Sequence, residues 1–133
     1  MCSLRSWWRD DEGVAAVEFG LLLPVLLAIL LGIMDYGHVF MVKLTMTNAA
    51  REGARVGITL PEGAAEPAAE AAATRYLTSA NITTAVVDSN APSNVDPEVR
   101  VNITLDYAPL IGFVPTPDSL TASAVMRWEL ATP

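Results

Sequence analysis

The residue with the most chemical potential in this sequence is a carboxylate inside its most apolar stretch. Glu18 is the one charged residue between Gly13 and Asp35. A charge at the centre of a membrane costs about 2.5–3.5 kcal/mol on insertion scales, and a charge retained there usually has a function. Two interpretations stay open. Glu18 serves a partner inside the membrane, or it lies close to the interface, little more than one helical turn from Val14, and reaches the headgroups.

The other reactive residue types do not form a catalytic or metal-binding pattern. The chain has one histidine, His38, and one cysteine, Cys2, so an intrachain disulfide is excluded. We interpret Cys2 as an unpaired cytoplasmic thiol and His38 as a solvated helix residue. The sequence also lacks a nucleophile elbow and a phosphate-binding loop. We therefore expect no enzyme activity, no metal and no cofactor.

The element that must position Glu18 is a membrane span over residues 14–34, which read VAAVEFGLLLPVLLAILLGIM. About 20 apolar residues in a helix cross the roughly 30 Å of hydrocarbon in a bilayer. A cleaved secretory signal is a weaker interpretation, because the run is long and no small-x-small pattern closes it. Arg5 and Arg9 precede the span and favour, weakly, a cytoplasmic N-terminus.

Length and charge limit the rest of the chain. The 133 residues suffice for an anchor and one small domain, and 52% of them are hydrophobic. The formal net charge is −7. Nucleic acid and anionic lipid attract clustered Lys and Arg, which this chain does not have, so neither is expected to be the main partner.

A second helical pattern over residues 35–58 continues directly from the span. Its small residues Ala49, Gly53 and Gly57 recur every four positions and predict a flat groove for close helix packing. An ordinary amphipathic helix lying on its own domain is the alternative. Glu52 and Arg55 have the spacing of an i, i+3 ion pair. The expected apolar stripe consists of Phe40, Leu44, Thr47, Ala50, Ala54 and Ile58.

Three residues in and just after the span bear on helix packing. Pro24 removes one backbone hydrogen bond and is expected to kink the helix. Gly32 and Gly37 allow another helix to approach closely.

The order and spacing of these residues resemble the TadE-like family, the minor pilins or pseudopilins of the tight-adherence, Flp-type pilus system. The resemblance is also present near the C-terminus, in the PLIGF loop and the LTASAVMR segment. The residues that carry it in the N-terminal region are Gly13, Val17-Glu18-Phe19, Leu23-Pro24, Gly32-Ile33, Asp35-Tyr36-Gly37, Asn48-Ala49-Ala50-Arg51-Glu52 and Ala54-Arg55.

The resemblance implies a processing and assembly chemistry. A prepilin peptidase would cut between Gly13 and Val14, removing residues 1–13 as a cytoplasmic leader. Glu18, followed by Phe19, would then pair with the new α-amino group of a neighbouring subunit. Two charges that are costly apart in lipid become tolerable together.

The family also implies a place for the protein. It would be a single-pass protein of the bacterial inner membrane with a periplasmic or extracellular C-terminal domain. Other pilins or pseudopilins and the inner-membrane pilus assembly platform would be its partners. A membrane-tethered binding module that does not enter a filament is the alternative function.

Residues 59–133 are expected to form a small exported α+β domain. A linker leads to a helix from Pro67 to Ala80, anchored by Tyr76 and Leu77. Alternation of apolar and polar residues predicts strands over 99–107 and 120–130, with a shorter strand over 82–87. The expected fold is pilin-like: a long helix, a short helix and a small antiparallel sheet. The Pro-rich loop 108–119 packs either under the sheet or against a partner, and the sequence leaves this open.

Overall fold

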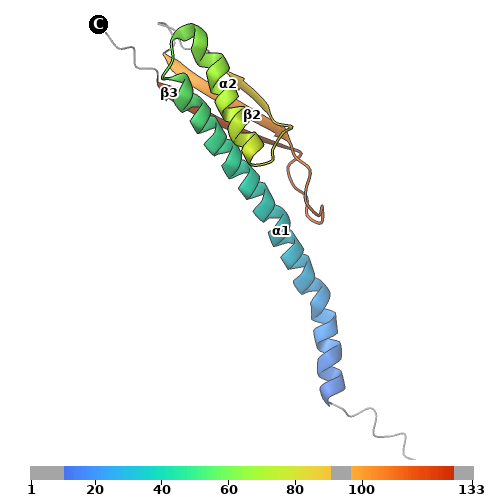
Figure 1. Cartoon of the computed structure of the whole chain (residues 1–133). Helices are drawn as coiled ribbons and strands as arrows, with labels where there is room; N and C mark the ends of the chain where they lie inside the picture. Colours follow the sequence, from blue (N-terminus) through green and yellow to red (C-terminus); the bar gives the residue numbers. More distant parts are fainter. Residues whose placement is uncertain (1–10, 91–96, 128–133) are drawn as a thin grey trace, which may run out of the picture.

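The computed structural model describes residues 11–90 and 97–127 and has the predicted α+β fold. A long N-terminal helix, α1, carries a small domain on its C-terminal half (Figure 1). Cys2, Arg5, Arg9, Trp128 and Leu130 lie outside the described residues. The elements in chain order are α1 (Asp11–Gly57), α2 (Glu62–Ser79), β1 (Val86–Ser89), β2 (Glu98–Asp106) and β3 (Ser119–Arg127).

The predicted span and the helix that follows it are one uninterrupted helix of 47 residues. At 1.5 Å per residue α1 is about 70 Å long. Among the described residues it is the one helix long and apolar enough to cross a membrane, and no residue of its most apolar window is buried. Its axis changes direction in the blue N-terminal half in Figure 1, the half that contains Pro24. A missing backbone hydrogen bond at proline accounts for such a bend.

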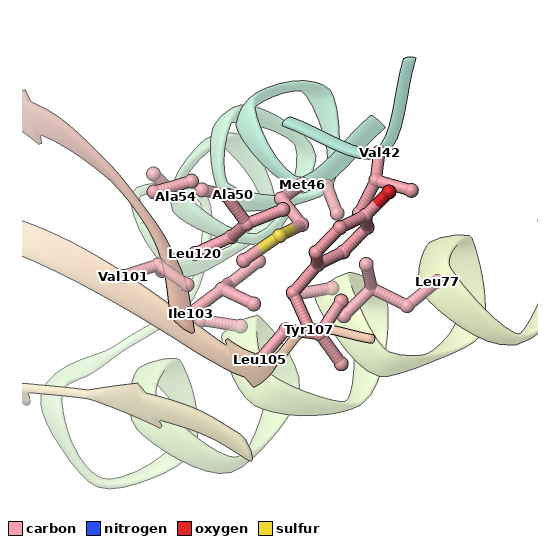
Figure 2. Close-up of a cluster of buried hydrophobic side chains, with 14 of the residues drawn as sticks. Val42, Met46, Ala50, Ala54, Leu77, Val101, Ile103, Leu105, Tyr107 and Leu120 are labelled. Carbon is pink, nitrogen blue, oxygen red and sulfur yellow. The ribbon is translucent and has the colours of Figure 1, made fainter. Parts of the chain in front are cut away.

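The domain has two layers, with α2 and the C-terminal half of α1 covering one face of a three-stranded sheet. The strand order is β1-β2-β3 and both pairings are antiparallel. The central strand β2 shows the predicted period of two, since alternate residues are buried under the helices. The core is drawn in Figure 2 and includes Met46, Leu77, Val101, Ile103, Leu105 and Leu120.

Small residues bring α1 very close to its neighbours in this core. A Cβ atom added to Gly53 would lie 2.7 Å from the carbonyl oxygen of Ala69 in α2. A Cβ atom added to Gly57 would lie 2.7 Å from a methyl carbon of Val99 in β2. Ala49 is fully buried in the same core. The Ala49–Gly53–Gly57 groove is therefore filled by the domain of the same chain.

The apolar stripe predicted for α1 is only partly the buried one. Phe40 and Leu44 are exposed, whereas Val39, Val42 and Met46 face the core. At 100° per residue the predicted stripe lies about a quarter turn from the buried face. The prediction was wrong here because the buried face is made largely of alanine and glycine, which carry little hydrophobic signal.

The second helix begins earlier than predicted, at Glu62, and Pro67 lies inside it. A proline at this position destabilises the helix only moderately. It leaves one carbonyl, that of Gly63, without its helical partner, and Gly63 and Pro67 are both exposed to water. Burial of Ala65, which lies in the part of α2 before Pro67, favours the longer helix. Leu77 is buried as predicted, but Tyr76 is 39% exposed and does not anchor the helix.

The first strand begins at Val86, four residues later than predicted. The preceding residues close α2 in a Schellman motif instead. Asn81 has a positive φ of 62°, and the Ile82 amide donates to the Leu77 carbonyl at 2.9 Å. Asparagine tolerates this left-handed conformation, and the hydrophobic residue after it packs back toward the helix. Ile82 is therefore the hydrophobic residue of a helix cap and not the start of a strand.

We expect Gly53→Ala to lower the free energy of unfolding by about 1–3 kcal/mol relative to Gly37→Ala. Both variants gain the same helix propensity, but nothing lies within 4 Å of a Cβ atom at Gly37, while position 53 faces backbone. Urea unfolding of the full chain in detergent micelles, followed by near-UV circular dichroism, measures the difference. Equal midpoints for the two variants would contradict the close packing described for Gly53.

Candidate functional site

The residues of the predicted processing and pairing site lie on the uncovered part of α1. Gly13 and Glu18 are exposed, and Val14 and Phe19 are 57% and 61% exposed. No ion pair of Glu18 is present within residues 11–90 and 97–127. The chain itself therefore supplies no cation to this carboxylate in its described part.

Beyond the span, α1 has an exposed face directed away from the domain, which we call the outer face. The N-terminal part of the outer face, next to the predicted span, is apolar: Phe40, Met41 and Leu44 are 71%, 64% and 61% exposed. Gly37 lies on the same side and is also exposed. The C-terminal part of the outer face is polar and consists of the family-motif residues Asn48, Arg51, Glu52 and Arg55.

The predicted pair on the outer face is formed. Arg55 donates two hydrogen bonds to the Glu52 carboxylate, at 2.9 and 2.7 Å. Hydrogen bonding from Arg55 lowers the pKa of Glu52, and burial of the carboxyl group opposes this shift only in part. Because both side chains are substantially exposed, the pair adds little to stability. Its position makes it available to another molecule.

A second polar centre lies where the span ends. Asp35 has no exposed surface, and its two carboxylate oxygens accept hydrogen bonds from the amides of Ile111 and Phe113, at 2.9 and 3.1 Å. These amides belong to the Pro-rich loop between β2 and β3. We call this contact the Asp35 clamp. It joins Asp35 to two residues that follow it in the chain by 76 and 78 positions.

The loop amides keep the Asp35 carboxylate ionised. Burial raises its pKa, but hydrogen bonding from the backbone of residues 111–114 outweighs burial, and the net pKa is lowered. Successive amides that converge on an anion in this way form a nest. The clamp thus satisfies a buried carboxylate without any cation, as in a helix cap or an oxyanion site.

Two further contacts hold the loop along α1. The Tyr36 hydroxyl donates to the Pro115 carbonyl at 3.2 Å. A Cβ atom added to Gly32 would lie 3.3 Å from a methyl carbon of Val114, so this glycine makes room for the loop. The predicted close approach at Gly32 is made by the chain's own loop.

His38 is not the solvated residue predicted from sequence. Its Nδ1 atom lies 2.7 Å from the hydroxyl oxygen of Tyr107, at the end of β2, and the pair is partly buried. Burial, and secondarily the charge of Asp35, raise the pKa of Tyr107, so the phenol stays protonated at neutral pH. Figure 2 shows the Tyr107 ring reaching up from the sheet toward α1 beside Val42. His38 therefore helps to join α1 to the sheet.

Sequence reasoning missed the clamp. The sequence places Asp35 in the family motif without indicating a role for it, and it leaves the position of the loop open. The usable signal was an acidic residue at the end of a span with no nearby cation, together with a glycine-containing loop, in which Gly112 adopts a φ of +75°. The described residues contain no group of three or more His, Cys, Asp or Glu placed to hold a metal ion.

Fold and site together define an α+β protein with one apolar helix able to span a membrane. The outer face of this helix and the Glu18 carboxylate have no partner in the described part of the chain. Residues 13–55 match the family model of TadE-like proteins, which confirms the resemblance over this segment. The match covers less than half of the chain. It ends before the loop and β3, so their resemblance stays a prediction. No curated protein and no solved structure matches the chain.

We expect Asp35→Asn to release the loop, because a carboxamide offers one acceptor oxygen and turns an NH₂ group toward amide donors. Amide hydrogen exchange at Ile111 and Phe113 should accelerate by on the order of tenfold or more. The Asp118→Asn variant, which changes an exposed carboxylate at the end of the same loop, is the matched control. Unchanged exchange in the Asp35 variant would show that the clamp does not hold the loop.

The lowered pKa of Asp35 also predicts how the clamp responds to pH. A carboxyl group whose pKa is depressed in the folded state stabilises that state above its ordinary pKa, and this stability is lost as pH falls through the folded value. Loop protection should therefore persist at neutral and mildly acidic pH and decline only below the ordinary value of 3.8. Protection factors of the same two amides across the pH range measure this; a decline between pH 5 and 7 is incompatible with the clamp.

Proposed function

We propose that this protein is a minor pilin or pseudopilin that acts in the assembly, initiation or tip of a tight-adherence pilus, for surface adhesion or secretion. The observation that carries the proposal is the outer face of α1. It continues the exposed surface of the span into the water-exposed part of the molecule. The match to TadE-like proteins over residues 13–55 supports the same role.

Lipid alone does not account for the apolar part of the outer face. If residues 14–34 cross the hydrocarbon, Phe40 and Leu44 lie about 9 and 15 Å beyond it along the helix. Their exposure in the isolated chain is then exposure to water. Covering such side chains stabilises a complex by about 1.5–3 kcal/mol each. The helix of a neighbouring subunit, packed parallel to α1, would cover both the span and this face.

Glu18 fits the same arrangement. After cleavage between Gly13 and Val14 by a prepilin peptidase, the new α-amino group of one subunit would meet Glu18 of the next. Phe19 would pack beside the pair. This requires the N-terminus in the cytoplasm, the helix in the inner membrane and the C-terminal domain outside the cytoplasm. The partners would be the assembly platform and the other pilins. The role is structural, without enzymatic activity.

The competing function is a membrane-tethered periplasmic or extracellular binding module outside any filament. The two functions differ in the fate of residues 1–13. Intact-mass analysis of the membrane fraction distinguishes them: a mature chain that begins at Val14 supports the pilin role, and an uncut chain supports the module.

Glu18→Ala is expected to block pilus assembly while the protein remains in the membrane at normal abundance. Removal of the carboxylate makes the span more apolar, so insertion should not suffer. The lost counter-charge is worth on the order of 2–5 kcal/mol if the pair is desolvated. Glu18→Gln should fail in the same way, because it keeps the shape but not the charge.

Leu21→Ala is the matched control for Glu18, since it truncates an exposed side chain one turn away without changing charge. Piliation and membrane abundance, measured together, give the result. Normal pili in both Glu18 variants would make Glu18 an interfacial residue. Loss of both variants from the membrane would assign it to stability or export.

Phe40→Glu tests the outer face. Because Phe40 is 71% exposed, the substitution should leave the fold and the membrane abundance unchanged, whereas a charge facing a neighbouring helix should strongly reduce piliation. Val86→Glu is the control, as Val86 is 68% exposed on an edge strand away from α1. Equal piliation in the two variants would remove the outer face as a subunit contact.

A further inference from the structure

The loop between β2 and β3, residues 108–118, exposes three large apolar side chains. Leu110, Ile111 and Phe113 are 59%, 44% and 56% exposed. No charged residue occurs between Asp106 and Asp118. These three side chains form an apolar patch without a charged residue in the loop around it.

The position of this patch along α1 is set by the contacts of the loop. The clamp places Ile111 and Phe113 beside Asp35, and Val114 packs on Gly32, one turn earlier in the helix. Figure 1 shows the loop extending from the sheet along α1 toward its N-terminal half. Since the span covers residues 14–34, the loop reaches the level of its last turn. At the same level of α1, Ile33 and Met34 are 63% and 53% exposed.

The backbone of the loop is suited to a medium poor in water. Irregular backbone that contacts the hydrocarbon must satisfy its amides internally, because no water is available there. The amides of Ile111 and Phe113 are taken up by Asp35. Pro109, Pro115 and Pro117 have no amide hydrogen to satisfy. The loop therefore exposes apolar side chains while hiding or lacking many of its donors.

We infer that this loop is a second membrane anchor. Leu110, Ile111 and Phe113 enter the boundary between headgroups and acyl chains of the leaflet at which α1 leaves the membrane. The inference rests on the proposed membrane span but not on the pilus role. The Asp35 clamp sets the depth of insertion, and the rigid connection to the sheet then fixes the orientation of the whole domain on the membrane surface.

Lipid is the occupant that these observations favour over another protein. A specific protein interface takes about 20–30 residues on each side, whereas this patch consists of one short loop. Insertion into the interface needs no shape complementarity and scales with buried apolar area. The negative chain and the acidic residues at both ends of the loop exclude attraction to anionic headgroups, so insertion is driven by the apolar side chains alone.

The test uses the full chain with Cys2→Ser, one copy per nanodisc of phosphatidylcholine, and a nitroxide label at one introduced cysteine. Leu110→Cys reports on the loop. Leu26→Cys, within the span, is the lipid control, and Val125→Cys, at the far end of β3 and 48% exposed, is the water control. The ratio of collisions with oxygen to collisions with a water-soluble nickel chelate measures the depth of each label.

The ratio at position 110 is expected to exceed that at position 125 severalfold, and to fall to the level of position 125 when Phe113→Asp is added. The ratio at position 26 should stay high in both cases. A water-like ratio at 110 beside a lipid-like ratio at 26 overturns the loop anchor and leaves the span intact. A water-like ratio at 26 overturns the span itself. Protection of position 110 that requires two chains per disc assigns the patch to a second copy and overturns the lipid proposal.

Discussion

The structure depends on one constraint: a single continuous helix serves two different environments. Most of the first half of α1 has no cover from the chain, while the second half is one wall of the domain core. Because the helix is unbroken from Asp11 to Gly57, the apolar segment and one wall of the domain core belong to the same element. Every surface on the domain therefore has a defined height along α1, and the change from one environment to the other takes place at Asp35.

The chemistry at this point of change is unusual because the buried carboxylate is paired with amides and not with a cation. A lysine or arginine side chain there would have to be desolvated together with the aspartate, and both ions would be costly. Hydrogen bonding from the backbone of residues 111–114 stabilises the charge, and the amides of Ile111 and Phe113 find their acceptor in the same carboxylate. One group thus solves two desolvation problems and ties the β2–β3 loop to the helix.

The distribution of side-chain size on α1 reverses the pattern of an ordinary amphipathic helix. The inner face is rich in glycine and alanine, which lets α2 and β2 approach closely, and the largest apolar residues beyond the span, Phe40 and Leu44, point outward. Close packing recovers dispersion energy that small side chains lose in hydrophobic area. Large side chains left outside are then free to contact other molecules, which is the basis of the proposed role in assembly.

Local patterns were sufficient to predict the long apolar helix, the period-two strand over Val99–Tyr107 and the Glu52–Arg55 pair, because each depends on residues close together in the chain. The same patterns placed the family motif at residues 13–55. They failed at the start of α2, at Ile82 and on the buried face of α1, where alanine, glycine and a helix cap carry no distinct periodicity. Only the tertiary structure decided that Asp35 holds the loop, since the bonded groups are 76 and 78 residues apart and the bond exists only when the sheet packs on the helix.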